Sequence, residues 1–85
     1  MNNIISTPEI TVYGADWCPD CRRAKKLLNE HGVPYQWVDI ETNRAGEEFV
    51  LKTNRGSRTI PTIVFGDGSI LVEPSNPQLI AKLGN

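Results

Sequence analysis

The order of hydrophobic patterns between residues 9 and 40 restricts the fold of this chain more than any other feature. Residues 9–13 alternate between polar and apolar side chains and are rich in β-formers, which predicts a strand, and residues 14–17 have the composition of a loop. A helical pattern follows, and residues 35–40 predict a second strand. Because a helix separates the two strands, they should pair in parallel through a right-handed crossover, which opens an α/β layer.

The signals of the first helix are local. Pro19 suits its first turn, and Gly32 suits its C-terminal end. Between them, four residues fall at helical spacing: Ala24, Leu27, Leu28 and His31. We therefore expect this helix to pack one face against the sheet.

A second helix is predicted for residues 44–54, where either Thr42 or Asn43 suits the N-cap. Its expected apolar stripe consists of Ala45, Phe49, Val50 and Thr53. Asn54 to Arg58 should form a polar loop that contains Gly56.

The C-terminal third predicts a hairpin and a last helix. Pro61 introduces a strand at residues 62–65, a turn at residues 66–68 contains two glycines, and residues 69–72 should return antiparallel. The last helix follows a cap at Ser75 or Asn76; it has Pro77 in its first turn, should bury Leu79, Ile80 and Leu83, and should end at Gly84. The expected order is βαβ-α-ββ-α, an α/β fold with a four-stranded mixed sheet flanked by three helices.

Length and charge narrow the classes of function. The 85 residues suffice for a single domain, residues 1–85. Nine Lys and Arg against ten Asp and Glu give no basic field for nucleic acid. The N-terminus lacks a basic start followed by an apolar stretch, and no apolar run approaches membrane length. We expect a cytoplasmic protein whose partners are small molecules or other proteins, with no membrane and no nucleic acid among them.

The chemistry-bearing motif is the pair Cys18 and Cys21, separated by two residues where the first strand passes into the first helix. If Cys18 caps that helix, its sulfur meets unpaired backbone N–H groups and the positive end of the helix dipole, which favour the thiolate. Cys21, one turn further on, points to the same side and should be more buried. Cys18 is thus the predicted nucleophile and Cys21 the resolving thiol, while Pro19 fixes the first turn between them.

The pair could also form a structural disulfide or belong to a structural zinc site. A structural disulfide is disfavoured in a reducing compartment, and its loop would be too short to stabilise the fold much. A structural zinc site needs four ligands, and the remaining candidate, His31, lies thirteen residues beyond Cys18 on the same predicted helix, about 20 Å away. We expect no metal, and we assign His31 a place at the helix end near the dipole.

The neighbours of the pair carry weaker signals. Asp20 should oppose thiolate formation at Cys18, whereas Arg22 and Arg23 favour it only if they fold back; a solvent-exposed helix face is the more probable place for both arginines. Trp17 either shields the sulfur as part of a partner-facing surface or packs at the strand end. Trp37 is expected in the core or on the sheet.

Two motifs resemble the glutaredoxin branch of the thioredoxin superfamily: the Cys18 to Cys21 segment with Trp17 before it, and Thr59, Ile60 and Pro61 ahead of a hairpin. Within that branch the sequence is most similar to the mycoredoxins, which reduce mixed disulfides between mycothiol and proteins. The further matching runs are residues 38–41, residues 43–45 with 48–50, Arg58 and Thr59 with Pro61 and Thr62, and residues 67–69 with Pro74 and Ser75. The resemblance covers nearly the whole chain and implies a thioredoxin fold.

The resemblance also implies site residues. It predicts a cis peptide before Pro61, with the backbone of Ile60 pairing with the substrate beside Cys18. Glutaredoxins commonly hold a carboxylate of glutathione at the start of the last helix through a Gly-Gly-x-Asp pattern, and residues 73–76 lack both glycines and the acidic residue. Glutathione is therefore disfavoured, and Ser75 and Asn76 are either contacts for a different thiol or a plain helix cap. The expected substrate-binding residues are Trp17, Pro19, Thr59, Ile60, Pro61, Ser75 and Asn76.

The sequence thus predicts a thiol–disulfide oxidoreductase of mycoredoxin type, with Cys18 and Cys21 as catalytic residues. We expect no tightly bound cofactor. Mycothiol should be the reducing co-substrate, and the partners should be proteins carrying mixed disulfides and a disulfide reductase of the thiol system. Two alternatives stay open: a dithiol donor reduced by thioredoxin reductase, for example for ribonucleotide reductase, and an iron–sulfur cluster carrier in which two chains contribute Cys18.

Overall fold

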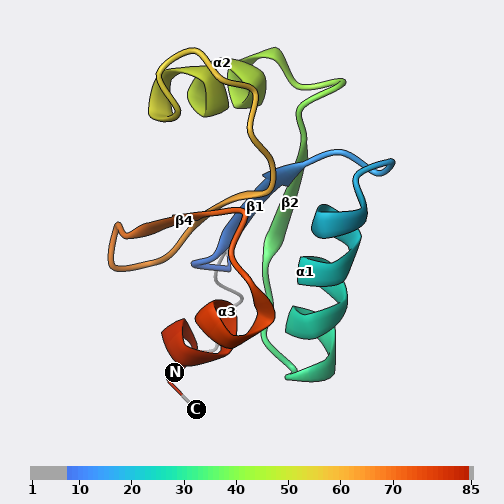
Figure 1. The fold of residues 1–85 in the computed structure, drawn as a ribbon, viewed down its shortest axis with the longest axis vertical. Helices are drawn as coiled ribbons and strands as arrows, with labels where there is room; N and C mark the ends of the chain where they lie inside the picture. The colour runs from blue at the N-terminus through green and yellow to red at the C-terminus, as the bar shows by residue number, and fades with distance from the viewer. Residues whose placement is uncertain (1–7, 85) are drawn as a thin grey trace, which may run out of the picture.

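The computed structural model describes residues 8–84 of the chain, and its elements follow the predicted order (Figure 1). They are β1 (Thr11–Gly14), α1 (Pro19–Glu30), β2 (Gln36–Asp39), α2 (Arg44–Thr53), β3 (Thr62–Val64), β4 (Ile70–Val72) and α3 (Asn76–Lys82). Within the described part of the chain, no helix is both long and apolar enough to cross a membrane.

The four strands form one mixed sheet in the order β2-β1-β3-β4. β1 and β2 run parallel, with Thr11 opposite Gln36 and Gly14 opposite Asp39, and α1 forms the crossover between them. β3 pairs antiparallel with both β1 and β4. The predicted parallel crossover and the predicted hairpin are both confirmed.

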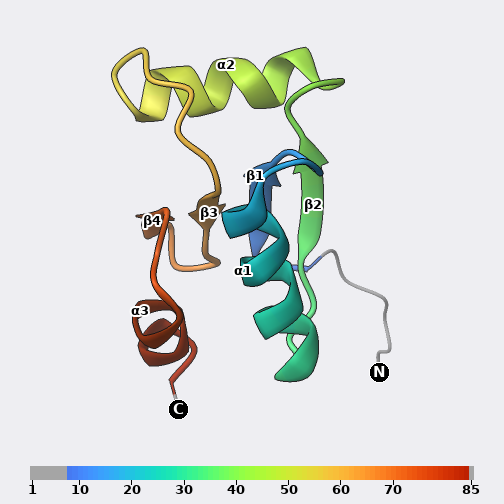
Figure 2. The same cartoon turned by 45° about the vertical axis from the view of Figure 1, so that its right-hand side comes forward.

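The two faces of the sheet are covered by different helices. Val12 and Ile63 are fully buried on one face, against Leu28 of α1 and Leu79 of α3. Tyr13, the next residue along β1, points to the other face, where its ring stacks on Phe49 of α2 with 4.7 Å between centroids. Figures 1 and 2 accordingly show α1 and α3 side by side, with α2 apart from both. This alternation along β1 is the period-2 pattern of a strand buried on both faces.

The predicted bounds of β2, β3, β4 and α2 are too long by one residue at one end, or at both ends for β2. Two larger details are wrong. The first strand begins at Thr11 rather than residue 9, and it includes Gly14, because pairing with β2 continues through that residue. In α2 the predicted inward residue Ala45 is exposed, and its neighbour Gly46 is buried instead. A Cβ at Gly46 would lie 2.6 Å from Cγ1 of Val38, so the helix approaches the sheet through a residue without a side chain.

The caps of the helices agree with the sequence. Asn43 begins α2 by accepting a hydrogen bond from the Gly46 N–H at 2.8 Å. Ser75 begins α3, and Leu79 of that helix is fully buried while Ile80 and Leu83 pack partly buried against the same cluster. The turn between β3 and β4 places Gly68 at φ +87°, which a residue without Cβ adopts freely.

Candidate functional site

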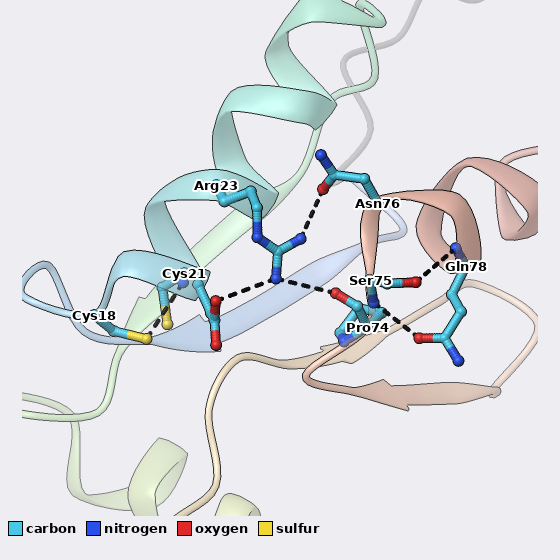
Figure 3. A network of polar contacts seen from close by, with 8 residues as sticks. Cys18, Cys21, Arg23, Pro74, Ser75, Asn76 and Gln78 are labelled. Atoms are coloured by element: carbon cyan, nitrogen blue, oxygen red, sulfur yellow. Dashed lines mark hydrogen bonds and ion pairs between the residues drawn. The ribbon is translucent and has the colours of Figure 1, made fainter.

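Cys18 is the N-cap of α1, as predicted. Its backbone is extended, with φ −80° and ψ 117°, and its sulfur accepts a hydrogen bond from the Cys21 N–H at 3.3 Å. The residue is 6% exposed. Figure 3 shows both sulfur atoms at the start of the helix, where the first backbone N–H groups point outward. The Cys18 sulfur thus receives a backbone donor and faces the positive end of the helix dipole.

Cys21 lies beneath Cys18, one helical turn further on, and is fully buried. Both cysteines are free thiols. Burial, followed by the hydrogen bond with Cys18, raises the pKa of the Cys21 thiol to about 12, although a backbone contact with Ala15 opposes the shift. At neutral pH Cys21 is therefore protonated, and the structure confirms the expected difference in burial between the two thiols.

Gly14 at the end of β1 makes room for the buried thiol. A Cβ built on Gly14 would lie 2.6 Å from Sγ of Cys21 and 2.8 Å from the ring of Trp37. Trp37 is half-buried and packs against the cluster of buried residues that contains both cysteines, which agrees with the expected place in the core or on the sheet. The strand, the ring and the helix together leave Cys21 no access to solvent.

The loop before α1 has a buried start at Ala15 and an exposed end at Asp16 and Trp17, and α1 itself holds it. Trp17 is 61% exposed, so its ring does not pack at the strand end. Arg22 donates to the carbonyl oxygen of Asp16 at 3.0 Å, which ties the loop to the first turn of the helix. Pro19 is exposed next to Cys18. The two residues that flank Cys18 in the chain, Trp17 and Pro19, thus present apolar surface to solvent.

The segment before β3 contributes Ile60 to the buried cluster that contains Cys18. The peptide bond between Ile60 and Pro61 is cis, and Ile60 is 6% exposed within the same buried cluster as both cysteines. The Pro61 carbonyl accepts from the N–H of Glu73 at 2.8 Å, and the Thr59 carbonyl accepts from the Thr62 hydroxyl at 2.8 Å. Ile60 thus joins the buried cluster that contains Cys18 although the two residues are 42 positions apart in the chain.

The expectation of a solvent-exposed face for Arg23 is wrong. Its guanidinium donates to Asn76 Oδ1 at 2.7 Å, to Asp20 Oδ1 at 3.3 Å and to the Pro74 carbonyl at 3.3 Å. Figure 3 shows this side chain extending from α1 to the start of α3. Two of its three partners lie 51 and 53 residues further along the chain, and no local pattern in the sequence indicates them.

Ser75 and Asn76 begin α3, on the far side of Arg23 from the cysteines (Figure 3). The Ser75 hydroxyl accepts from the Gln78 N–H at 3.2 Å, and the Gln78 side chain accepts from the Ser75 N–H at 2.8 Å, which is a capping box. The side chain of Ser75 thus acts as the plain helix cap that the sequence allowed. The side-chain oxygen of Asn76 is taken by Arg23.

An ion-pair network that the sequence analysis missed lies beside Thr59. Arg58 donates to Glu41 at 2.7 Å and to Glu47 at 2.8 Å, which joins the segment before Pro61 to the start of α2. Its hydrogen bond lowers the pKa of Glu41, and a second hydrogen bond from the Trp17 side chain acts in the same direction. The three charged residues are 11 and 17 positions apart, so helical spacing could not have indicated them.

No metal-binding arrangement is present among residues 8–84, where no three His, Cys, Asp or Glu side chains come together. His31 stands at the C-terminal end of α1, with Nδ1 3.0 Å from the Leu27 carbonyl, and so at the opposite end of the helix from Cys18.

Comparison with known proteins gives a consistent result. A family model described as Glutaredoxin matches residues 10–70. A provisionally named glutaredoxin of Mycobacterium tuberculosis is 47% identical over 77 residues, which are 91% of this chain and 92% of that protein. Mycoredoxin 1 of Corynebacterium glutamicum is 35% identical over 74 residues, 87% of this chain and 91% of that protein. The crystal structure of a glutaredoxin from Archaeoglobus fulgidus superposes with a TM-score of 0.74 at 23% identity, covering 92% of this chain and 88% of that one.

Proposed function

The chain belongs to the glutaredoxin family, and from that premise we propose that it reduces mixed disulfides between mycothiol and proteins through Cys18. The family establishes a thiol–disulfide oxidoreductase that uses a low-molecular-weight thiol. The similarity to Mycoredoxin 1 favours mycothiol as that thiol. A pair of free thiols suits the reducing conditions of the cytoplasm, where we place the reaction.

The observation that carries the proposal is the different setting of the two sulfurs. Cys18 caps α1 and borders the exposed loop, whereas Cys21 is fully buried with its pKa raised to about 12. A sulfur at a helix start next to an exposed loop is placed to meet a substrate, and a resolving thiol need only reach the intermediate that forms on its neighbour. The arrangement supports Cys18 for attack and Cys21 for resolution.

The reaction then proceeds by two thiol–disulfide exchanges. The Cys18 thiolate attacks the mycothiol sulfur of the mixed disulfide; the new bond joins Cys18 to mycothiol, and the protein leaves as a thiolate that takes up a proton. A second mycothiol attacks the bound mycothiol sulfur and frees Cys18, and mycothiol disulfide leaves for its reductase. In the alternative second step, Cys21 attacks Sγ of Cys18, which releases mycothiol and leaves a Cys18–Cys21 disulfide.

We propose that substrates contact the neighbours of Cys18 in the chain and the segment before β3. Trp17 and Pro19 are exposed, and Ile60 shares a buried cluster with Cys18. The backbone of Ile60, between Thr59 and Pro61, would pair with an extended peptide. Ser75 and Asn76 remain proposed contacts for the small thiol; as the hydroxyl of Ser75 and the amide oxygen of Asn76 are engaged, backbone groups and the amide N–H atoms of Asn76 would make them.

Turnover with alternative reductants tests the proposal. A protein capped with mycothiol is the substrate, and the reductant is either mycothiol with its disulfide reductase or glutathione with glutathione reductase at equal concentration. We expect turnover with mycothiol and much slower turnover with glutathione. Equal rates with the two thiols would contradict the assignment of mycothiol while leaving the oxidoreductase class in place.

Variants of the two cysteines separate this proposal from a thioredoxin-reductase-dependent dithiol donor. Cys21→Ser should keep much of the activity on mycothiol-capped protein, because the second mycothiol can discharge Cys18. The donor mechanism needs both thiols, so it predicts an inactive Cys21→Ser variant and no stimulation by mycothiol. Full activity with thioredoxin reductase and none with mycothiol would overturn the proposal.

The absorption spectrum of freshly purified protein addresses the third possibility. A cluster carrier shows the visible absorption of an iron–sulfur centre, and it loses that absorption in Cys18→Ser. We expect no such band, because the proposed cycle keeps Cys18 free for attack.

A further inference from the structure

The residue pair Asp20 and Arg23 is not explained by the exchange reaction described above. Asp20 stands between the two cysteines, in the first turn of α1, and its side chain is half exposed. Its negative charge reaches the buried thiol, since it is one of the groups, after burial and Cys18, that raise the pKa of Cys21. A bare carboxylate here opposes the thiolate on which the reaction depends.

Arg23 is held so that it faces this carboxylate. One of its nitrogen atoms lies 3.3 Å from Asp20 Oδ1 and also 3.3 Å from the Pro74 carbonyl, while the other terminal nitrogen donates to Asn76 at 2.7 Å. Pro74 is buried, so its carbonyl is a fixed acceptor. Because the guanidinium is planar and its donors form a rigid fork, two acceptors from the α3 side fix the direction in which it presents its charge.

The neighbouring arginine does not do the same. Arg22 is exposed and donates to the Asp16 carbonyl in the loop before α1, and it forms no ion pair with Asp20. Among the described residues Arg23 is the cation paired with Asp20. The contact differs from an ordinary i,i+3 surface pair because its cation is also bound by residues 51 and 53 positions away.

We propose that Arg23 is a positioning residue for the thiol chemistry: held by Asn76 and the Pro74 carbonyl, it balances the charge of Asp20, so that Cys18 reacts beside an ion pair rather than beside a lone carboxylate. The inference rests on the proposed role of Cys18 as the attacking thiol. Through Arg23, the residues at the start of α3 would influence the reactivity of the thiols without contacting the substrate.

The rate of Cys18 alkylation tests this inference without any thiol co-substrate. Iodoacetamide is added at pH 7 to a series made in the Cys21→Ser background: Arg23→Gln, Asp20→Asn and the double variant. Arg23→Gln should slow alkylation about two- to five-fold, the range expected for a partly exposed charge pair. Asp20→Asn should restore the rate in the double variant, because the charge that Arg23 balances is then absent.

Two further variants sharpen the result. Lys26→Gln removes a positive charge from an exposed site on the same helix and serves as the matched control, with an unchanged rate expected. Asn76→Ala removes one of the acceptors that hold Arg23, so it should slow alkylation by less than Arg23→Gln and have no effect when Arg23 is already Gln. Thermal unfolding of each variant shows whether it is folded at the assay temperature.

The equilibrium with a dithiothreitol redox buffer is the second readout, measured with both cysteines present. Loss of Arg23 destabilises the reduced, thiolate-containing form, so the couple should become more reducing, and Asp20→Asn should reverse the shift. A purely structural defect in Arg23→Gln would not be repaired by Asp20→Asn. Equal alkylation rates for Arg23→Gln and its parent, or a slow double variant, would overturn the inference.

The outcome is separable from that of the mycothiol assay. Failure of mycothiol turnover together with the expected alkylation series would reject the proposed co-substrate and keep the role of Arg23. Normal mycothiol turnover together with equal alkylation rates across the series would keep the proposed co-substrate and reject the role of Arg23.

Discussion

The N-termini of α1 and α3 share one design and differ in the chemistry of the cap. Each has an extended cap residue, a proline in the first turn and a cap side chain that accepts from the N–H three residues on, at 3.3 Å for Cys18 and 3.2 Å for Ser75. At α3 the bonding is reciprocal, because Gln78 returns a bond to the Ser75 N–H. At α1 the third residue is Cys21, and the Cys18 N–H donates instead to the Ala15 carbonyl.

The difference shows how one local motif serves stability in one place and chemistry in another. The capping box at α3 uses its donors and acceptors within the helix. The sulfur cap at α1 is a single, weaker bond to an atom that is also the reactive group. A helix start therefore becomes a reaction site when its cap atom is a nucleophile and its third residue supplies the resolving thiol.

Replacing Cys18, the cap of α1, should have the largest effect on turnover. Cys18→Ser gives α1 the same kind of cap as α3, so the helix should be at least as stable, while turnover should fall by roughly a thousand-fold or more. Steady-state turnover and urea unfolding of the same sample measure the two effects. Activity retained in this variant would mean that Cys21 can attack.

Filling the space beside the resolving thiol should have the next largest effect. Gly14→Ala places a Cβ 2.6 Å from Sγ of Cys21, so the sulfur or the Trp37 ring must move, at a cost of about 1 to 3 kcal/mol in the free energy of unfolding. Urea unfolding of the reduced protein measures the loss. Gly32→Ala is not a suitable control because of its positive φ, whereas exposed Asn29→Ala in α1 is suitable.

Removing the cap of α3 should cost stability without affecting the thiols. Ser75→Ala loses the bond to the Gln78 N–H and should lower the free energy of unfolding by about 1 kcal/mol. The alkylation rate of Cys18 should stay the same, since the Ser75 side chain does not contact Arg23. A change in that rate would show that the two helix starts are coupled through the cap itself.

The ion pair between Asp67 and Lys82, at the C-terminal end of α3, should contribute the smallest effect on the free energy of unfolding. Lys82 at 2.7 Å, together with Ser69, holds the pKa of Asp67 well below its usual value of about 4. Since the folded-state pKa is lowered, the stabilisation is present above about pH 4 and is lost as the pH falls toward the folded pKa. Asp67→Asn should thus be less stable than wild type at pH 6, with a difference that shrinks below pH 4 in urea unfolding. A difference that stays constant across this range would exclude the ion pair as its cause.

Sequence patterns account for the fold and for the centre of the site because both are locally encoded. The parallel crossover follows from the patterns of residues 9–40, and Cys18 is recognisable as a cap because Pro19 and a helical stripe come directly after it. The ends of strands are less well encoded: β1 extends to Gly14 only because β2 offers it a partner.

The parts of the site that escaped the sequence analysis depend on contacts between distant segments. Arg23 looks like any other exposed arginine of a helix until α3 is folded against α1 and supplies Asn76 and Pro74. The choice of Gly46 over Ala45 as the buried residue of α2 depends on how closely that helix approaches Val38. No propensity or periodicity carries this information, because each case is decided by the partner surface.

The different roles of the two thiols are tested most directly by locating the first alkylation. The reduced wild-type protein is treated at pH 7 with less than one equivalent of iodoacetamide, and the modified peptide is identified by mass spectrometry. The account predicts modification at Cys18, because Cys21 is fully buried with its pKa raised to about 12. Modification at Cys21, or equally at both cysteines, would contradict it.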